Sequence, residues 1–211
     1  MTRFPDIAGI VLAGGEGRRM GGAAKALCEV GGVAIIDRIL PILRPLFAEI
    51  VIVANDPAPY RGRAGVAVVP DVHRGCGPIG GIHAGLTAIT SPGALVVACD
   101  MPFLAPGPIA RVCEAARAGA FDLAVPCSPR GFEPLHAFYA RGVAPLLEQA
   151  IRRGRHKIRR AVAECRIAYV PFSAAELGAF CNVNSRWDLD ACNGGADARE
   201  AAGTLAGHRG S

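Results

Sequence analysis

Glycines and cations are concentrated directly after the first apolar segment of the chain, Ile7–Leu12. The stretch from residue 12 to residue 21 holds four glycines together with Arg18 and Arg19, and Lys25 follows four residues later. Glycines let a backbone approach a ligand closely and turn its N–H groups toward it, while neighbouring cations neutralise phosphate. The composition of this loop therefore predicts a site for a nucleoside triphosphate.

Two common phosphate-binding loops do not fit this stretch. A Walker loop ends in Gly-Lys-Ser or Gly-Lys-Thr, whereas Lys25 lies between two alanines. A dinucleotide-binding fingerprint that begins at Gly15 needs glycine or alanine at its sixth position, which is Met20 here. A glycine-rich turn with solvated arginines is the plain alternative, but the spacing from Gly15 through Arg19 to Lys25 is more specific than a glycine-rich loop alone.

A carboxylate, Asp100, follows another apolar run, Ala94–Ala98, with Pro102 two residues further on. A carboxylate at the exit of a buried strand is costly unless it binds something. Mg²⁺ is held in proteins by one or two carboxylates together with substrate phosphates. A cap for a helix over Pro106–Arg117 is the alternative, but Asp100 lies too far upstream for it. Asp100 is therefore a candidate Mg²⁺ ligand.

Polar residues also follow two further apolar runs. Asn55 comes after Ile50–Ala54 and offers both a donor and an acceptor to a base edge or a ribose. Asp71 comes after Val66–Val69, and each of these two residues is also common in turns. Paired glycines and a proline within residues 75–81 then precede a helix, whose N-terminus favours nearby anions. In a parallel sheet, ligands bind at the carboxyl ends of strands, where all these loops lie.

Two asparagines, Asn182 and Asn184, precede the last predicted helix. Alternate residues of an extended segment point the same way, so both amides can face one ligand. Ser185 is suited to cap the helix, which explains the serine but not both asparagines. His136 belongs to an apolar segment, Leu135–Tyr139, and on that pattern alone a structural histidine is favoured over a catalytic one.

Helix-like stretches alternate with the strand-like runs. The predicted strands are Ile7–Leu12, Ile50–Ala54, Val66–Val69, Ala94–Ala98, Leu123–Val125 and Ile167–Val170. The predicted helices are Ala34–Leu46, Gly80–Ile89, Pro108–Ala118, Val143–Arg152 and Lys157–Ala163. Pro41 and Pro45 are expected to kink or end the first helix, and Leu135–Tyr139 is a candidate antiparallel strand. The alternation predicts an α/β fold: a single-domain, Rossmann-like three-layer sandwich with a mostly parallel sheet.

Composition supports one domain with a substantial core. The chain has 211 residues, of which 51% are hydrophobic, and this excludes disorder as the main state. Large apolar residues become scarce from Asn193 onward. We therefore assign residues 1–192 to the folded domain and residues 193–211 to a flexible C-terminal tail.

The charges argue against a nucleic-acid-binding protein. Six cations within Arg152–Arg160 exceed the net charge of +5 by one, so the remainder of the chain carries −1. This basic stretch is either a solvated helix face or an attractor for an anionic substrate. The eight cysteines include no Cys-x-x-Cys pair, which predicts reduced thiols and a cytoplasmic location. Neither a signal peptide nor a membrane-spanning segment is expected.

The segment Leu12–Lys25 resembles the signature of nucleotidyltransferases that make sugar nucleotides and cofactor dinucleotides. Three further segments, Cys99–Leu104, Pro134–Tyr139 and Phe180–Asn184, extend the resemblance over Ile7–Leu189. Over that length the chain is most similar to the molybdenum cofactor guanylyltransferase family. The resemblance implies a Rossmann-like fold of the nucleotide-diphospho-sugar transferase type.

This resemblance implies that GMP is transferred from GTP to the terminal phosphate of molybdopterin, with Mg²⁺ as cofactor and pyrophosphate as by-product. In that family a glycine at position 14 goes with guanine and an alanine with cytosine. The resemblance assigns catalysis to Arg19, Lys25 and Asp100, and the metal to Asp100. It assigns molybdopterin binding to Asn182 and Asn184. It assigns GTP binding to Leu12, Ala13, Gly14, Gly15, Lys25, Asn55, Asp71 and Asp100.

Three alternatives share part of this pattern. A molybdopterin cytidylyltransferase, or another small-molecule nucleotidyltransferase, would have the same first loop. A nicotinamide oxidoreductase would use a similar sheet, but its fingerprint fails at Met20. A non-enzymatic carrier that delivers cofactor to molybdoenzymes would need no acidic metal site. Such carriers and acceptor molybdoenzymes are also candidate partners, whereas nucleic acid and membrane are not expected.

Overall fold

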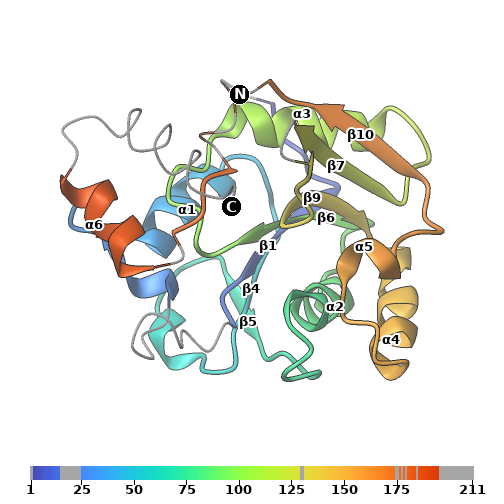
Figure 1. Ribbon diagram of the computed structural model, residues 1–211, viewed down its shortest axis with the longest axis horizontal. Coiled ribbons are helices and arrows are strands. Elements are labelled where there is room, and N and C mark those ends of the chain that lie inside the picture. Colours follow the sequence, from blue (N-terminus) through green and yellow to red (C-terminus); the bar gives the residue numbers. More distant parts are fainter. Residues whose placement is uncertain are drawn as a thin grey trace.

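The computed structural model of the protein describes residues 2–14, 25–128, 131–173, 176, 178, 180–183 and 185–194. Within this part of the chain, the main sheet has eight strands in the order β10-β7-β9-β6-β1-β4-β5, with β8 paired to β7 (Figure 1). The strands are β1 (Ile7–Leu12), β4 (Ile50–Val53), β5 (Ala67–Val69), β6 (Gly93–Ala98), β7 (Leu123–Ser128), β8 (Gly131–Phe132), β9 (His136–Ala140) and β10 (Ile167–Pro171).

The sheet is mostly parallel and reverses its direction of growth at β1. Strand β1 pairs in parallel with β4 on one side and with β6 on the other, and β4 pairs in parallel with β5. The chain therefore builds outward from β1 to β5 and then returns to the opposite side of β1. Such a reversal opens a crevice at the carboxyl ends of the two central strands, where α/β proteins bind their ligands. The predicted antiparallel strand is confirmed as β9, which lies between β6 and β7.

Helices cover both faces of the sheet (Figure 1). They are α1 (Ile35–Leu43), α2 (Pro78–Ala88), α3 (Pro106–Arg117), α4 (Ala144–Arg152), α5 (Ile158–Ala161) and α6 (Arg186–Gly194). Apolar residues of α1 and α3 belong to one buried cluster, and those of α2, α4 and α5 belong to a second. Strand β1 supplies Ile7 and Val11 to the first cluster and Ala8 and Ile10 to the second. A strand that is buried on both faces has apolar residues at every position, which is why strand β1 could be predicted from the sequence.

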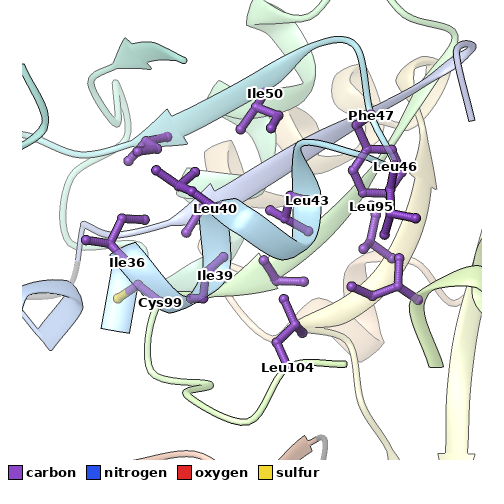
Figure 2. Close-up of a cluster of buried hydrophobic side chains, with 14 of the residues drawn as sticks. Ile36, Ile39, Leu40, Leu43, Leu46, Phe47, Ile50, Leu95, Cys99 and Leu104 are labelled. Atoms are coloured by element: carbon purple, nitrogen blue, oxygen red, sulfur yellow. The ribbon is translucent and has the colours of Figure 1, made fainter. Parts of the chain in front are cut away.

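Helix α1 contributes much of the first cluster. Figure 2 shows Ile36, Leu40 and Leu43 of this helix beside the central strands, with Leu46 and Phe47 continuing the apolar contact beyond its end. Pro41 lies inside α1, and the helix ends at Leu43, so the prediction that prolines would kink or end it agrees with the observed end.

Helix α2 packs very closely on β1. A Cβ atom at Gly85 of α2 would lie 2.7 Å from a side-chain carbon of Ile10, so only glycine permits this approach. The close packing fixes the N-terminal end of α2 at the carboxyl end of β1.

Two short antiparallel pairings were missed by the sequence interpretation. The first is a hairpin of β2 (Glu29–Val30) and β3 (Val33–Ala34), whose turn residues Gly31 and Gly32 both have positive φ angles of 59° and 73°. The second is the pairing of β7 with β8. Two-residue strands lack the periodicity that sequence patterns detect, although a Gly-Gly pair between them is typical of a tight hairpin turn.

The end of the described chain is helical. Ser185 caps α6 as predicted, since its Oγ accepts the N–H of Asp188 at 3.1 Å and the Asp188 carboxylate accepts the N–H of Ser185 at 2.8 Å. Asn193 and Gly194, which we assigned to the tail, belong to α6, and the amide oxygen of Asn193 accepts the N–H of Gly31 at 2.7 Å. Residues 195–211 lie outside the described residues. Among the described helices, none has the length and hydrophobicity that a membrane span requires.

Candidate active site

A cleft of about 720 Å³ lies at the carboxyl ends of β1, β4, β5 and β6. Each of these strands delivers at least one residue to it through the loop that follows, and the N-terminal end of α2 closes one side. The lining residues are Leu12, Gly14, Lys25, Val53, Asn55, Asp71, Arg74, Gly75, Gly77, Pro78, Gly81, Ala98, Cys99, Asp100 and Leu135. The cleft is therefore at the point where the direction of sheet growth reverses.

Most of the residues expected to bind nucleotide meet in this cleft. Leu12, Gly14, Lys25, Asn55, Asp71 and Asp100 line it. Ala13 does not, because it is buried and its N–H donates to the carbonyl of Val53 at 2.8 Å. The predictions for Gly15, Arg19 and Asn184 fall outside the described residues.

Lys25 and Asp100 contact one another directly. The Lys25 Nζ donates to Oδ2 of Asp100 at 3.1 Å, and the two side chains are only 23% and 14% exposed. Lys25 opens a short 3-10 helix, while Asp100 directly follows Cys99 at the end of β6. A cation and a carboxylate thus share the wall of the cleft and form a partly buried ion pair.

The second carboxylate oxygen of Asp100 is suited to a metal ion. Oδ1 is buried and has no hydrogen-bond partner among the described residues. An unsatisfied buried carboxylate oxygen is costly, and a divalent cation satisfies it. Within the described part of the chain, no three His, Cys, Asp or Glu side chains are grouped to hold a metal. Asp100 therefore fits an ion of the Mg²⁺ type, which takes one or two protein carboxylates and completes its shell with phosphate and water oxygens.

The Asn55 and Asp71 loops are held together by hydrogen bonds. The amide oxygen of Asn55 accepts the N–H of Asp71 at 3.2 Å, and Oδ1 of Asp71 accepts the N–H of His73 at 2.8 Å. A Cβ atom at Gly80 would lie 2.9 Å from both carboxylate oxygens of Asp71, so glycine is required there. The loops after β4 and β5 therefore present a fixed polar wall against the start of α2.

Arg74 is a cleft residue that the sequence interpretation missed. It lies in the loop before α2, beside Gly75 and Gly77, whose φ angles are +80° and +72°. These left-handed conformations are accessible to glycine at little cost and shape the loop around the cleft. Arg74 could have been predicted as a cleft residue, because a cation between two glycine-rich loops is suited to neutralise phosphate.

Asn182 lies next to the metal-binding candidate. The N–H of Val183 donates to the carbonyl of Asp100 at 2.8 Å, which fixes the Asn182 segment beside the end of β6. The side-chain oxygen of Asn182 is buried, and in the part of the chain that the structure describes it has no hydrogen-bond partner. Asn182 is not among the residues that line the cleft, so its contact with the acceptor stays a prediction.

The cysteine nearest to the site is not a nucleophile. Burial, together with the negative charge of Asp100, raises the pKa of Cys99 to about 12, so the thiol stays protonated at neutral pH. The structure describes all eight cysteines, and none of them forms a disulfide. The six cations of the basic stretch do not line the cleft. All six are exposed around α4 and α5, and Arg152 is paired to Glu148 at 2.7 Å.

His136 is fully buried, which agrees with the structural role favoured by its sequence context. Its exposed fraction is 0%, neither ring nitrogen has a hydrogen-bond partner within the described ranges, and its ring packs edge-on against Phe180 at 4.6 Å. Burial lowers the pKa of His136 to about 3, so the imidazole is neutral in the folded protein.

Replacing His136 with phenylalanine is expected to make the protein less sensitive to mild acid. The unfolded chain binds a proton at this histidine below its usual pKa of about 6.5, whereas the folded chain does so only near 3. Stability is therefore lost as the pH falls through this window, by about 1.4 kcal/mol per pH unit at this one site. Urea denaturation at pH 7.5 and 5.5 measures the difference, and equal losses in both proteins would contradict a neutral buried histidine.

The protein has a Rossmann-like sheet with a cleft at the point where the direction of sheet growth reverses. Glycines, cations and a carboxylate line this cleft. These features together are those of a nucleotidyltransferase. The profile of the MobA-like NTP transferase domain family matches residues 9–168, and the chain belongs to this family.

Relatives and solved structures agree with this assignment. The chain is 40% identical over 186 residues to the probable molybdenum cofactor guanylyltransferase of Pelotomaculum thermopropionicum, covering 86% of this chain and 89% of that protein. It is 34% identical over 192 residues to the molybdenum cofactor guanylyltransferase of Desulfosudis oleivorans, covering 87% and 93%. The crystal structure of molybdopterin-guanine dinucleotide biosynthesis protein A from Archaeoglobus fulgidus superposes with a TM-score of 0.76 at 30% identity, covering 89% of this chain and 97% of that one.

Proposed function

We propose that this nucleotidyltransferase transfers GMP from GTP to the terminal phosphate of molybdopterin, forming molybdopterin guanine dinucleotide and pyrophosphate. The convergence of Gly14, Lys25 and Asp100 on one cleft carries the proposal. Relatives that match over most of their length are named for this activity, which supports the choice of substrates. A cytoplasmic location is proposed as well, since reduced cysteines are the rule in that compartment and none of the eight forms a disulfide.

The chain is proposed to bind GTP along the loops that follow β1, β4 and β5. Residues 12–15 supply a backbone that a ligand can approach closely. Arg19 and Lys25 neutralise the triphosphate and then the departing pyrophosphate, and Arg74 adds a third cation. Asn55 and Asp71 hold the guanosine part with amide and carboxylate groups that match donors and acceptors of a base or ribose.

The acceptor phosphate is already a nucleophile at neutral pH, so no protein group has to activate it. Asn182, and Asn184 with it, orient this phosphate for in-line attack on the α-phosphorus of GTP. Positioning and charge stabilisation then account for the catalysis, as expected for transfers to phosphorus. No covalent enzyme intermediate is needed, in keeping with the protonated Cys99 thiol.

A divalent ion is the expected cofactor, and we propose Mg²⁺ held by Asp100. When bound, it supplies positive charge to the phosphate oxygens as charge develops on them. The buried Oδ1 of Asp100 supports this assignment. In the absence of ligand, Oδ2 is neutralised by Lys25.

Pyrophosphate release from each nucleoside triphosphate, with and without molybdopterin, tests the proposed function. GTP is expected to support release only when molybdopterin and Mg²⁺ are both present. Faster release with CTP would instead identify a cytidylyltransferase. Release with a sugar phosphate as acceptor would identify a sugar nucleotidyltransferase, and no release at all would leave a carrier of the finished cofactor.

Gly14 is the proposed determinant of base selectivity. Among the described residues, a Cβ atom there would have one neighbour within 4 Å, the Val53 carbonyl oxygen at 3.7 Å, which is ordinary van der Waals contact, so alanine is accommodated by this part of the chain. Gly14→Ala is therefore expected to act on the ligand alone and to lower the ratio of GTP to CTP rates by roughly tenfold. Gly142→Ala is a matched control, because its Cβ also meets open space and Gly142 does not line the cleft. An unchanged ratio would remove Gly14 as the discriminator.

A further inference from the structure

Four side chains in successive contact join the Asn182 segment to the body of the protein. This row consists of Arg111, Phe172, Phe180 and His136. The Arg111 guanidinium of α3 lies 4.1 Å from the centroid of the Phe172 ring. The Phe172 and Phe180 rings are 5.0 Å apart, and the Phe180 and His136 rings are 4.6 Å apart, both edge-on at 78°. The row therefore runs from the surface of α3, through the segment that follows β10, to strand β9.

The row is anchored at both ends. At the inner end, Phe172, Phe180 and His136 are 4%, 7% and 0% exposed, so these rings are locked by packing. At the outer end, the Arg111 guanidinium is held by an ion pair with Glu176 and a hydrogen bond to the carbonyl of Pro171. Arg111 is therefore fixed over the Phe172 ring rather than free in solvent.

Asn182 lies between two fixed points of this segment. On one side, Phe180 is clamped in the row. On the other side, Val183 is buried and its N–H is bonded to the carbonyl of Asp100 at 2.8 Å. The two residues that separate Phe180 from Val183 can hardly shift without breaking one of these contacts. The position of the Asn182 amide relative to Asp100 thus depends on the row.

We propose that Arg111 is a positioning residue for the acceptor substrate: by holding Phe172 and Phe180, it fixes the Asn182 amide beside Asp100. This inference rests on the proposed function, because it takes Asn182 to bind the acceptor. Arg111 itself is not among the residues that line the cleft, where GTP and the metal are proposed to bind. Its loss should therefore weaken acceptor binding while leaving GTP binding unchanged.

Arg111→Ala tests the proposal, and Arg117→Ala is its matched control. Both arginines belong to α3, and both place a guanidinium over a phenylalanine ring, that of Arg117 lying 4.8 Å from the Phe4 centroid. Both are also paired to a carboxylate and are similarly exposed, 42% for Arg111 and 37% for Arg117. Only Arg111 is connected to the Asn182 segment, so a general loss of packing would affect both variants alike.

Two measurements on the full chain separate positioning from a merely structural effect. In Arg111→Ala, the KM for molybdopterin should rise roughly tenfold while the KM for GTP stays constant, and Arg117→Ala should change neither. Hydrogen exchange at the Val183 amide, measured without substrates, should be roughly tenfold faster in Arg111→Ala alone. Arg111→Lys keeps the cation over the ring but loses the planar fork, so it should restore part of both losses.

The contrary results are distinct. Unchanged exchange at Val183 in Arg111→Ala would overturn the proposal at its first step, since the row would not hold the segment. Faster exchange with an unchanged KM for molybdopterin would overturn it at the second step. In that case the segment is anchored as described, but Asn182 does not bind the acceptor and the proposed function loses its acceptor site. Equal changes in the KM for molybdopterin and in Val183 exchange in Arg117→Ala would show that the row contributes only general packing stability, and would overturn the proposal.

Discussion

Replacing Asp100 with asparagine should lower the rate of pyrophosphate release by about a thousandfold, equivalent to about 4 kcal/mol of transition-state stabilisation. The change preserves the shape of the side chain but removes the charge that a divalent ion requires. It also removes the anionic partner of Lys25, which Oδ2 of Asp100 contacts at 3.1 Å. Release is measured at saturating GTP, molybdopterin and Mg²⁺, so that weakened binding does not mask the effect on turnover.

Asp56→Asn is the matched control for this variant. Asp56 also follows a strand of the parallel sheet, but it is exposed, does not line the cleft, and accepts the N–H of Ala58 at 2.9 Å. Asparagine preserves that acceptor, so activity should stay close to that of the unchanged protein. Full activity in Asp100→Asn would show that the ion is held elsewhere, and a similar loss in Asp56→Asn would point to general damage to these loops.

The sequence allowed the candidate site residues to be predicted where they directly follow a strand of the parallel sheet. β1, β4 and β6 are short apolar runs buried on both faces, and β5 is a short, partly exposed run at the edge of the sheet. Such runs are recognisable without any structure. Once these strands are parallel, the rule for ligand binding at carboxyl ends identifies Gly14, Asn55, Asp71 and Asp100 as neighbours. The six parallel strands and the mostly parallel sheet are confirmed on this basis.

Contacts between distant segments could not be predicted in the same way. Lys25 and Asp100 are 75 residues apart, and their ion pair depends on how the loops after β1 and β6 converge. The aromatic row joins residues from α3, β9 and the segment after β10, and no local pattern marks its members as partners. Arg74 was overlooked for a related reason, because its exposed side chain carries no periodic signal and only the packing of α2 on β1 brings its loop to the cleft.

Replacing Lys25 with alanine should change the affinities for nucleotide and for metal in opposite directions. A charge-assisted hydrogen bond to phosphate contributes about 1.5–3 kcal/mol, so the Kd for GTP should rise roughly tenfold to a hundredfold. Without nucleotide, however, Lys25 competes with a divalent ion for the Asp100 carboxylate. Its removal should therefore lower the Kd for Mn²⁺ alone, which calorimetry measures alongside GTP.

Opposite changes in the Kd for GTP and the Kd for Mn²⁺ make this variant more informative than a simple loss of activity. Partial unfolding would weaken the binding of both ligands. Lys157, the second of the two lysines in the chain, provides the control. It is exposed at the start of α5, within the basic stretch and away from the cleft, so Lys157→Ala should leave both affinities unchanged. An unchanged affinity for GTP in Lys25→Ala would remove this residue from the phosphate site. Weaker Mn²⁺ binding would mean that the Lys25–Asp100 pair supports the metal site instead of competing with it.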